Sequence, residues 1–250
     1  MRRFLIDDIH GERNTLLLSG AEAAHMTKVL RMGPGDKCIV IDKSGNRALC
    51  EIEKFGNGSV LLKVLDRLSP PTDPPVPIVL CQAILKNRAM DLVVEKASEL
   101  GVYCLRPFLA ARSVVKPDEK SAANKMRRWN EIACSAVKQS DRRTPMLIEP
   151  IHTFVEMLKT LRHDGKNLNL ILWEQEREKS IGAAITHSGD LDTVTVIVGP
   201  EGGFCIEEIN SARAAGVSSA GLGARILRAE TAAITLAAIL QYEFGGLEPT

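Results

Sequence analysis

The sequence lacks several features that would assign a protein to a class directly. Its 250 residues include 6 cysteines but no C-x-x-C or C-x-C pair, and most of the cysteines lie in apolar runs such as Val79-Leu80-Cys81. We expect reduced core residues, not a disulfide frame or a zinc site. No 18 apolar residues run together, and the N-terminus reaches acidic residues before a long apolar core develops. We therefore expect a cytoplasmic protein without an export signal or a membrane span.

Two nucleotide-binding motifs are also missing. The segment Gly221-Leu222-Gly223 begins like a dinucleotide fingerprint, but Ile226 stands where a third glycine is required. No G-K-[S/T] phosphate loop occurs either. A Rossmann dinucleotide site and nucleoside triphosphate hydrolysis therefore have no support in the sequence.

The chain has almost no net charge. It holds 32 basic and 31 acidic residues, a formal charge of +1, which excludes a uniformly basic surface. The charges are unevenly distributed, because residues 1–70 hold 11 basic and 9 acidic residues, residues 86–143 hold 13 and 7, and residues 144–250 hold 8 and 14. The basic middle segment suggests a polyanionic partner for one face. Solvated helix faces that merely differ in charge are the alternative explanation.

Prolines divide the chain into two predicted domains. Five prolines lie within residues 69–77, where they fix the backbone and exclude a helix or a central strand. We therefore predict a first domain over residues 1–70, a linker over 71–77 and a second domain over 78–250. The first domain has β-rich runs at residues 3–6, 15–18, 37–42, 47–53 and 59–65, and one helix from about residue 21 to 30. Five short strands and one helix predict a small β-barrel.

The second domain alternates between strands and helices. Apolar runs predict strands at residues 78–85, 103–109, 168–173, 193–198 and 217–222, and helices at 88–100, 121–140, 206–215 and 230–244. This alternation is typical of a mostly parallel α/β sheet, in which ligands bind at the carboxyl ends of the strands. Three segments follow such strands: Trp173-Glu174, the glycine loop Gly199-Pro200-Glu201-Gly202-Gly203-Phe204, and residues 221–231. The glycine loop can approach a ligand closely, although a plain strand-to-helix turn has the same pattern.

Together these segments resemble the SPOUT class of knotted methyltransferases. The resemblance is carried by Ile197-Val198-Gly199-Pro200-Glu201-Gly202-Gly203-Phe204 and by Leu222-Gly223-Ala224-Arg225-Ile226-Leu227-Arg228-Ala229-Glu230-Thr231-Ala232. Within that class, residues 91–102, the stretch 129–142 with Gln139-Ser140-Asp141-Arg142, and His25 with Val29-Leu30-Arg31 resemble the RsmE family, which methylates N3 of a uridine in 16S ribosomal RNA. The resemblance covers nearly the whole chain. Cys205 departs from the serine expected at a helix cap.

The resemblance implies a PUA-like β-barrel RNA-binding domain followed by an α/β SPOUT domain with a trefoil knot, an exception to the rule that folds are unknotted. It also implies that S-adenosylmethionine is the cofactor and that the protein is a homodimer. The apolar 230–244 helix is a candidate for the dimer seam, and a core helix within one subunit is the alternative. The implied cofactor-binding residues are Leu172, Trp173, Glu174, Gly199, Pro200, Glu201, Gly202, Gly203, Leu222, Gly223, Ile226 and Leu227.

The implied chemistry needs few protein groups and no metal. The enzyme must align an in-line attack on the sulfonium methyl group and help uracil N3 to lose its proton. Arg228 is our candidate for stabilising the developing uracilate. Glu230 is a candidate proton acceptor, or it complements the helix dipole, and Glu201 is expected to brace the glycine loop. No cysteine follows a proline, which argues against a covalent cysteine route.

RNA contacts are expected from the barrel and from the basic middle segment. His25, Lys28 and Arg31, spaced i, i+3 and i+6, should project from one side of the barrel's helix, although His25 could equally be hydrogen-bonded within the fold. The expected RNA-binding residues are Arg3, His25, Lys28, Arg31, Lys86, Arg88, Arg112, Arg127, Arg128 and Arg142. Each alone is typical of a solvated side chain, but as a set they predict salt-sensitive binding to 16S ribosomal RNA or the small ribosomal subunit.

Two other functions stay open at the level of sequence. A non-catalytic RNA-binding ribosome assembly factor would keep the fold and lose the methyl donor. A SPOUT methyltransferase acting on a ribose 2′-hydroxyl or a guanine would keep the cofactor loops and change the target atom. The intact glycine loop argues against the first, and the motifs at 91–102 and 139–142 favour uridine over the second.

Overall fold

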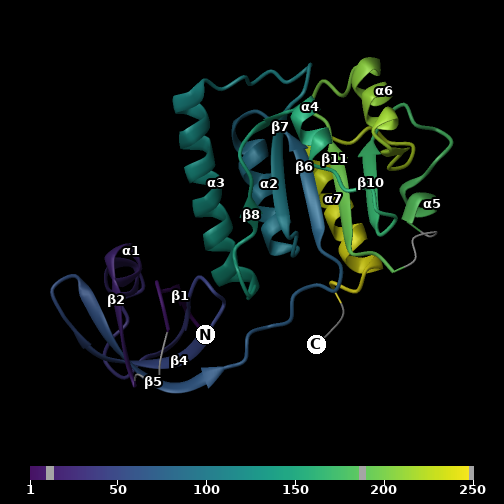
Figure 1. The fold of residues 1–250 in the computed structure, drawn as a ribbon. Helices are drawn as coiled ribbons and strands as arrows, with labels where there is room; N and C mark the ends of the chain where they lie inside the picture. The colour runs from purple at the N-terminus through teal and green to yellow at the C-terminus, as the bar shows by residue number, and fades with distance from the viewer. Residues whose placement is uncertain (10–13, 186–189, 248–250) are drawn as a thin grey trace. The chain divides into compact units, whose positions relative to one another are not determined.

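The structure of the protein is a computed structural model that describes residues 1–9, 14–185 and 190–247 (Figure 1). The chain forms two compact units. The first consists of Met1–Thr72 with Ser135–Pro145, and the second of Asp73–Cys134 with Met146–Thr250. The boundary between the units at Thr72–Asp73 lies within the proline-rich segment. The 135–145 segment, which the sequence analysis assigns to the second domain, packs instead with the first unit.

The first unit is built on a curled five-stranded sheet, drawn in purple and blue in Figure 1. Its strands are β1 (Arg3–Leu5), β2 (Thr15–Ser19), β3 (Lys37–Ile41), β4 (Arg47–Phe55) and β5 (Ser59–Leu68). The sheet order is β1-β3-β4-β5-β2, with β1 parallel to β3 and the other neighbours antiparallel. All five predicted strands are confirmed. Alternating side chains fill one core, which includes Phe4, Leu18, Val40, Ile52 and Leu62.

The predicted helix of this unit has two parts. The α-helix α1 (Gly20–Ala24) continues as a π-helical turn, η1 (His25–Val29), in which the Leu30 N–H donates to the His25 carbonyl at 3.0 Å. Arg31 lies beyond this turn with a φ of 52°. A π turn has a wider spacing than an α-helix, and Arg31 lies outside it, so the regular helical spacing from which a shared face was expected does not hold. The shared face of His25, Lys28 and Arg31 stays a prediction. A 3.6-residue pattern gives no warning of an inserted π turn.

The end of helix α3 (Glu119–Ser140) and the residues after it are held in the first unit by charged groups. The Asp141 carboxylate forms ion pairs with Arg47 and with Arg3, the latter at 2.9 Å, and Lys138 Nζ lies 2.7 Å from Glu22 Oε1. The Arg47 side chain is only 5% exposed. Partial burial would raise the pKa of Asp141, but the hydrogen bond and charge of Arg47, aided by Arg3, lower it overall.

The second unit contains a parallel sheet. Its order is β12-β10-β11-β6-β7-β8, with β9 also paired to β7. The strands are β6 (Ile78–Ala83), β7 (Cys104–Leu109), β8 (Leu147–Ile148), β9 (His152–Thr153), β10 (Asn167–Leu172), β11 (Thr193–Val198) and β12 (Ser218–Ala220). The carboxyl ends of β10, β11 and β12 carry the three segments that the sequence analysis singles out.

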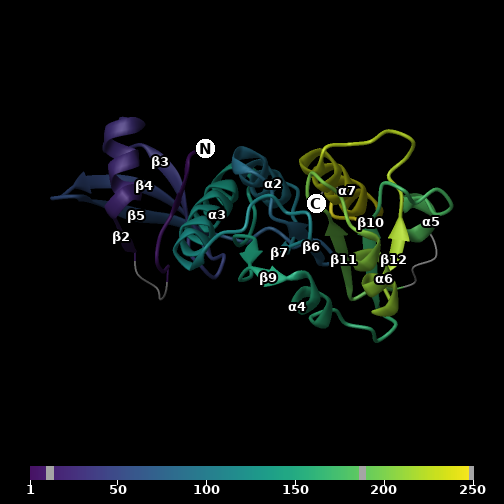
Figure 2. The same ribbon diagram turned by 90° about the horizontal axis from the view of Figure 1, so that it is seen from above.

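Helices cover both faces of this sheet. They are α2 (Asn87–Glu99), α4 (Phe154–Lys159), α5 (Ile181–Ile185), α6 (Ile206–Ala214) and α7 (Ala229–Glu243), besides α3. Figure 2 shows α2, α3 and α7 on one side and α4 and α6 on the other. Alternate β6 residues enter the two cores, with Ile78 and Leu80 in one and Val79 and Cys81 in the other. The sheet is therefore buried on both faces, as its continuous apolar strands predict.

The predicted α/β class is confirmed, and each predicted strand and helix of the second unit is found. The short elements β8, β9, α4 and α5 were not predicted. Helix α7 buries Ala233, Leu236 and Leu240 in the core of the second unit, so one of its faces packs within the subunit. All six cysteines are free, and none of the helices among the described residues is both long and apolar enough to span a membrane. The trefoil knot stays a prediction.

Candidate active site

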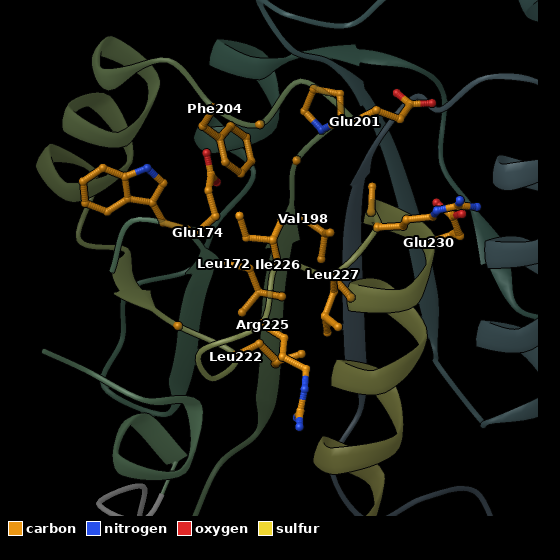
Figure 3. Close-up of a pocket in the computed structure, with 18 of the residues that line it drawn as sticks. Leu172, Glu174, Val198, Glu201, Phe204, Leu222, Arg225, Ile226, Leu227 and Glu230 are labelled. Carbon is orange, nitrogen blue, oxygen red and sulfur yellow. The ribbon is translucent and has the colours of Figure 1, made fainter. Parts of the chain in front are cut away.

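A cavity of about 700 Å³ lies in the second unit, where the loops after β10, β11 and β12 meet the starts of α2 and α7 (Figure 3). This is the edge at which parallel α/β sheets bind ligands. The cavity is lined by every residue of the expected cofactor set, namely Leu172, Trp173, Glu174, Gly199, Pro200, Glu201, Gly202, Gly203, Leu222, Gly223, Ile226 and Leu227, and by Arg228 and Glu230. The fold thus brings together three segments that are far apart in the sequence.

The glycine loop makes a tight turn that only glycine permits. The Gly203 N–H donates to the Pro200 carbonyl at 2.9 Å, and Gly203 has a φ of 65°. A Cβ atom on Gly203 would lie 2.6 Å from Glu174 Oε1. Glycine is required here both by backbone conformation and by close approach. The turn therefore leaves room for the Glu174 carboxylate at the edge of the cavity.

Three side-chain contacts fix the position of the glycine loop. Gln82, which is 0% exposed, donates from Nε2 to the Gly199 carbonyl at 3.3 Å. The Glu201 carboxylate accepts the Lys86 backbone N–H at 2.9 Å, which is a bracing contact. Arg112 donates to the Gly202 carbonyl at 3.2 Å. Gln82 was missed by sequence reasoning, although a single polar residue in an otherwise apolar strand is a signal of a special role.

The loop after β7 is joined to the start of α6 by one buried carboxylate. Glu208 accepts the Ala111 N–H at 2.8 Å and the Cys205 N–H at 3.0 Å. Glu208 thus satisfies a backbone donor at the start of α6, where Cys205 stands in place of the expected serine. The same contact holds the segment that carries Arg112 beside the glycine loop.

The opposite wall of the cavity is held by a polar network around Glu176. The Ser219 hydroxyl donates to Glu176 Oε2 at 2.5 Å, and Arg213 Nη2 donates to Ser219 Oγ at 2.9 Å. The Arg213 guanidinium also lies 5.2 Å from the centre of the Trp173 ring. The hydrogen bond from Ser219, with those from nearby backbone N–H groups, lowers the pKa of Glu176. This carboxylate is therefore charged and structural.

The middle of the cavity is apolar, and its rim is charged. Figure 3 shows Leu172, Val198, Ile226 and Leu227 facing one another, with Glu174 at one end and Arg225 at the other. The Ile226 side chain is 83% exposed, which leaves apolar surface for a ligand to cover. Arg225 and Arg228 are exposed, and neither has a side-chain hydrogen bond or ion pair within the described parts of the chain. Val198 and Arg225 also line the cavity, although they are not in the expected cofactor set.

The expected RNA-binding residues of the second unit occupy different environments. Lys86 lines the cavity, and Arg88 is exposed at the start of α2. Arg127 is exposed near Asn124, whereas Arg128 forms an ion pair of 2.7 Å with Asp91. Arg112 is exposed but contacts the glycine loop. These residues therefore do not form one uniform surface.

In the first unit, His25, Lys28 and Arg31 are exposed, and the His25 ring packs edge-on against Phe4. Arg3 is engaged by Asp141 and by the Lys138 carbonyl. The half-buried Arg142 offers its carbonyl to Arg47. Among the expected RNA-binding residues of the first unit, only His25, Lys28 and Arg31 are thus exposed.

Comparison with known proteins agrees with this site. A family model described as an RNA methyltransferase domain matches residues 72–241, and one described as an RNA methyltransferase PUA domain matches residues 18–65. Ribosomal RNA small subunit methyltransferase E of Bacillus subtilis is 28% identical over 236 residues, which are 93% of this chain and 91% of the relative. The protein of that name from Mycobacterium bovis is 31% identical over 241 residues, 92% of this chain and 87% of the relative.

A solved structure is similar over almost the full length. The crystal structure of a ribosomal RNA small subunit methyltransferase E from Neisseria gonorrhoeae, bound to S-adenosyl methionine, is 30% identical and has a TM-score of 0.86 over 97% of both chains. The fold and the matched domains define an RNA methyltransferase of the SPOUT class with a PUA-like first unit. The chain belongs to the ribosomal RNA small subunit methyltransferase E family.

Proposed function

We propose that this chain transfers the methyl group of S-adenosylmethionine to N3 of a uridine in the 16S ribosomal RNA of the small ribosomal subunit. The observation that carries the proposal is the single cavity in which the three loops of the second unit meet, with Arg228 and Glu230 in its wall. The names of the relatives, and the ligand named for the solved structure, support the same reaction.

The residues of the cavity fit this cofactor. Its volume of about 700 Å³ lies within the range of small-molecule sites. Leu172, Ile226 and Leu227 offer apolar surface to an adenine ring, and backbone groups of Gly199, Leu222 and Leu227 would contact adenine and ribose. When bound, S-adenosylmethionine supplies an electrophilic methyl group on a sulfonium. The carboxylates of Glu174 and Glu201 provide negative charge at the same cavity.

Arg228 is the proposed catalytic residue. It lies directly before α7 and lines the cavity, and its guanidinium has no partner among the described residues. A cation in this position would stabilise the negative charge that develops on uracil O2 or O4 as N3 loses its proton. Glu230, half-buried in the first turn of α7, is the proposed acceptor of that proton. The dipole of α7 is the alternative reason for its position.

RNA binding is proposed for exposed basic side chains on each unit. In the second unit these are Lys86, Arg88, Arg112, Arg127 and Arg128, and in the first unit they are His25, Lys28 and Arg31. Contacts to phosphates would make the binding salt-sensitive. For Arg3 and Arg142 we propose structural roles instead, because both are engaged around the Asp141 cluster.

A homodimer and a cytoplasmic location complete the proposal. Helix α7 buries one face within the subunit, and Tyr242 near its end is 73% exposed, which offers a large side chain to a second copy. Sedimentation of the wild type and a Tyr242→Glu variant tests this part. The expected result is a dimer for the wild type and a larger monomer fraction for the variant.

The central experiment has two arms. Calorimetric titration with S-adenosylmethionine should give saturable binding, and absence of binding would favour a non-catalytic assembly factor. The purified chain should then methylate small ribosomal subunits that lack the modification, with 3-methyluridine identified by mass spectrometry of nucleosides. A 2′-O-methylated nucleoside or a methylguanosine as the product would instead assign a different target atom.

A further inference from the structure

A second cavity, of about 290 Å³, lies in the second unit between α2 and α3. Its lining residues are Arg88, Met90, Asp91, Lys125, Arg128 and Trp129, none of which lines the first cavity. Met90 and Trp129 are buried at 1% and 2% exposure and form its apolar base. The other four side chains are charged. This is a small site with a buried apolar base and charged walls.

The charges in this cavity do not cancel. Asp91 Oδ2 accepts both Arg128 Nε at 2.9 Å and Arg128 Nη2 at 2.7 Å, so these two residues neutralise each other. Arg88 and Lys125 have no side-chain hydrogen bond or ion pair within residues 1–9, 14–185 and 190–247. Two cations therefore face one small cavity without a counter-ion. Such an arrangement favours an anion with several acceptor oxygens.

The position of the cavity relates it to the first one. Lys86 and Ala89 line the first cavity, whereas Arg88 and Met90 line the second. The first turn of α2 thus separates the two, and an α-helix with its side chains is about 10 Å wide. A ligand long enough to cross this turn can occupy both cavities. RNA is such a ligand, with an anionic phosphate at every nucleotide.

We propose that the second cavity binds a backbone phosphate of the RNA strand that carries the methylated uridine. Arg88 and Lys125 donate to the phosphate oxygens, and the Arg128–Asp91 pair holds the wall between them. Because the Trp129 ring is buried, it offers no face on which a base could stack, which favours a phosphate over a nucleobase. This inference rests on the proposed function, since it takes RNA as the substrate.

The test compares the salt dependence of RNA binding between matched variants. Fluorescently labelled chains are titrated with unmodified small ribosomal subunits between about 50 and 200 mM salt. The Arg88→Ala/Lys125→Ala variant should bind at least about tenfold more weakly at low salt, with a log–log salt slope reduced by about one. The Lys120→Ala/Lys159→Ala control removes two exposed lysines outside both cavities and should keep the wild-type slope.

Further readouts separate a phosphate site from a structural role. The Arg88→Lys/Lys125→Arg variant keeps both charges and should restore the slope, and calorimetry should give an unchanged affinity for S-adenosylmethionine in all variants. An equal slope in the pocket and control variants would overturn the phosphate site while leaving the proposed function intact. A wild type that binds subunits with the expected slope but methylates nothing would instead refute the proposed function alone.

Discussion

Two pairs of arginines, one pair in each unit, are used in opposite ways. In the first unit, Arg47 is buried and, with Arg3, is paired to the single carboxylate of Asp141. In the second, Arg225 and Arg228 are exposed at the cavity, and neither has a partner among the residues that the structure describes. The two arginines paired with Asp141 hold the first unit together. Arg225 and Arg228, which have no such carboxylate beside them, are left to act on a ligand.

Replacing Arg228 should give the largest effect on activity. Arg228→Ala removes the proposed cation from uracil and should lower the turnover rate by at least about 100-fold, the scale measured for loss of one charge-stabilising donor. Affinity for S-adenosylmethionine should stay within about tenfold of the wild type. The measurements are single-turnover methyl transfer and calorimetry. Loss of folding in this variant would mean that Arg228 is structural and would break the contrast between the units.

Replacing Arg47 should give the largest effect on stability. Arg47→Ala deletes a buried guanidinium and its hydrogen bonds at Asp141 and at the Arg142 carbonyl, and should lower the free energy of unfolding of the first unit by about 2 kcal/mol. The control is Lys43→Ala, because the Lys43–Asp7 pair is fully solvated and should contribute less than about 0.5 kcal/mol. Denaturant titration measures both. Equal effects would contradict the structural role of Arg47.

Two buried glutamines of the second unit allow a side chain that holds the cavity to be compared with one that does not. Gln82 holds the Gly199 carbonyl, so Gln82→Leu should weaken binding of S-adenosylmethionine by about fivefold, the value of one net hydrogen bond. The amide of Gln241, buried on α7, has no hydrogen-bond partner in the described residues and lies outside the cavity. Gln241→Leu should therefore leave cofactor affinity unchanged. Equal losses in calorimetry would show that Gln82 acts through general stability only.

The smallest expected effect is a dependence of stability on pH at Asp141. Its folded-state pKa is lowered, so its contribution is present above the unfolded value of 3.8 and is lost as the pH falls through the folded value. Asn also tolerates the positive φ of 61°, so Asp141→Asn is a matched variant. The stability advantage of the wild type, less than about 1 kcal/mol because Asp141 is half-exposed, should disappear at acidic pH, once the pH has fallen through the lowered folded-state pKa. An advantage that persists there would exclude the charge as its source.

Most of the fold could be predicted because its elements are marked locally. The strands of both units are apolar runs bounded by turn residues. The strand predicted at residues 193–198 has the same bounds as β11. The elements β8 and β9 have two residues each, which is too short for a periodic pattern. The π turn at His25 was missed because it interrupts a helical pattern without a glycine or proline.

The candidate site could be predicted as a set of loops but not as a set of contacts. The three segments that line the cavity follow strand ends, which are visible in the sequence. The contact of Arg112 with the Gly202 carbonyl joins two loops 90 positions apart, and that of Gln82 with the Gly199 carbonyl joins β6 to the glycine loop 117 positions away. The pairing of Arg3 with Asp141 likewise depends on the return of the chain to the first unit. Such contacts require the tertiary structure.

The most direct test of the proposed reaction is mass spectrometry of ribosomal RNA nucleosides from a strain that lacks this protein. We predict that 3-methyluridine is absent from the small-subunit RNA of this strain, that the wild-type chain restores it, and that Arg228→Ala does not. An unchanged amount of 3-methyluridine in the deletion strain would contradict the proposed reaction.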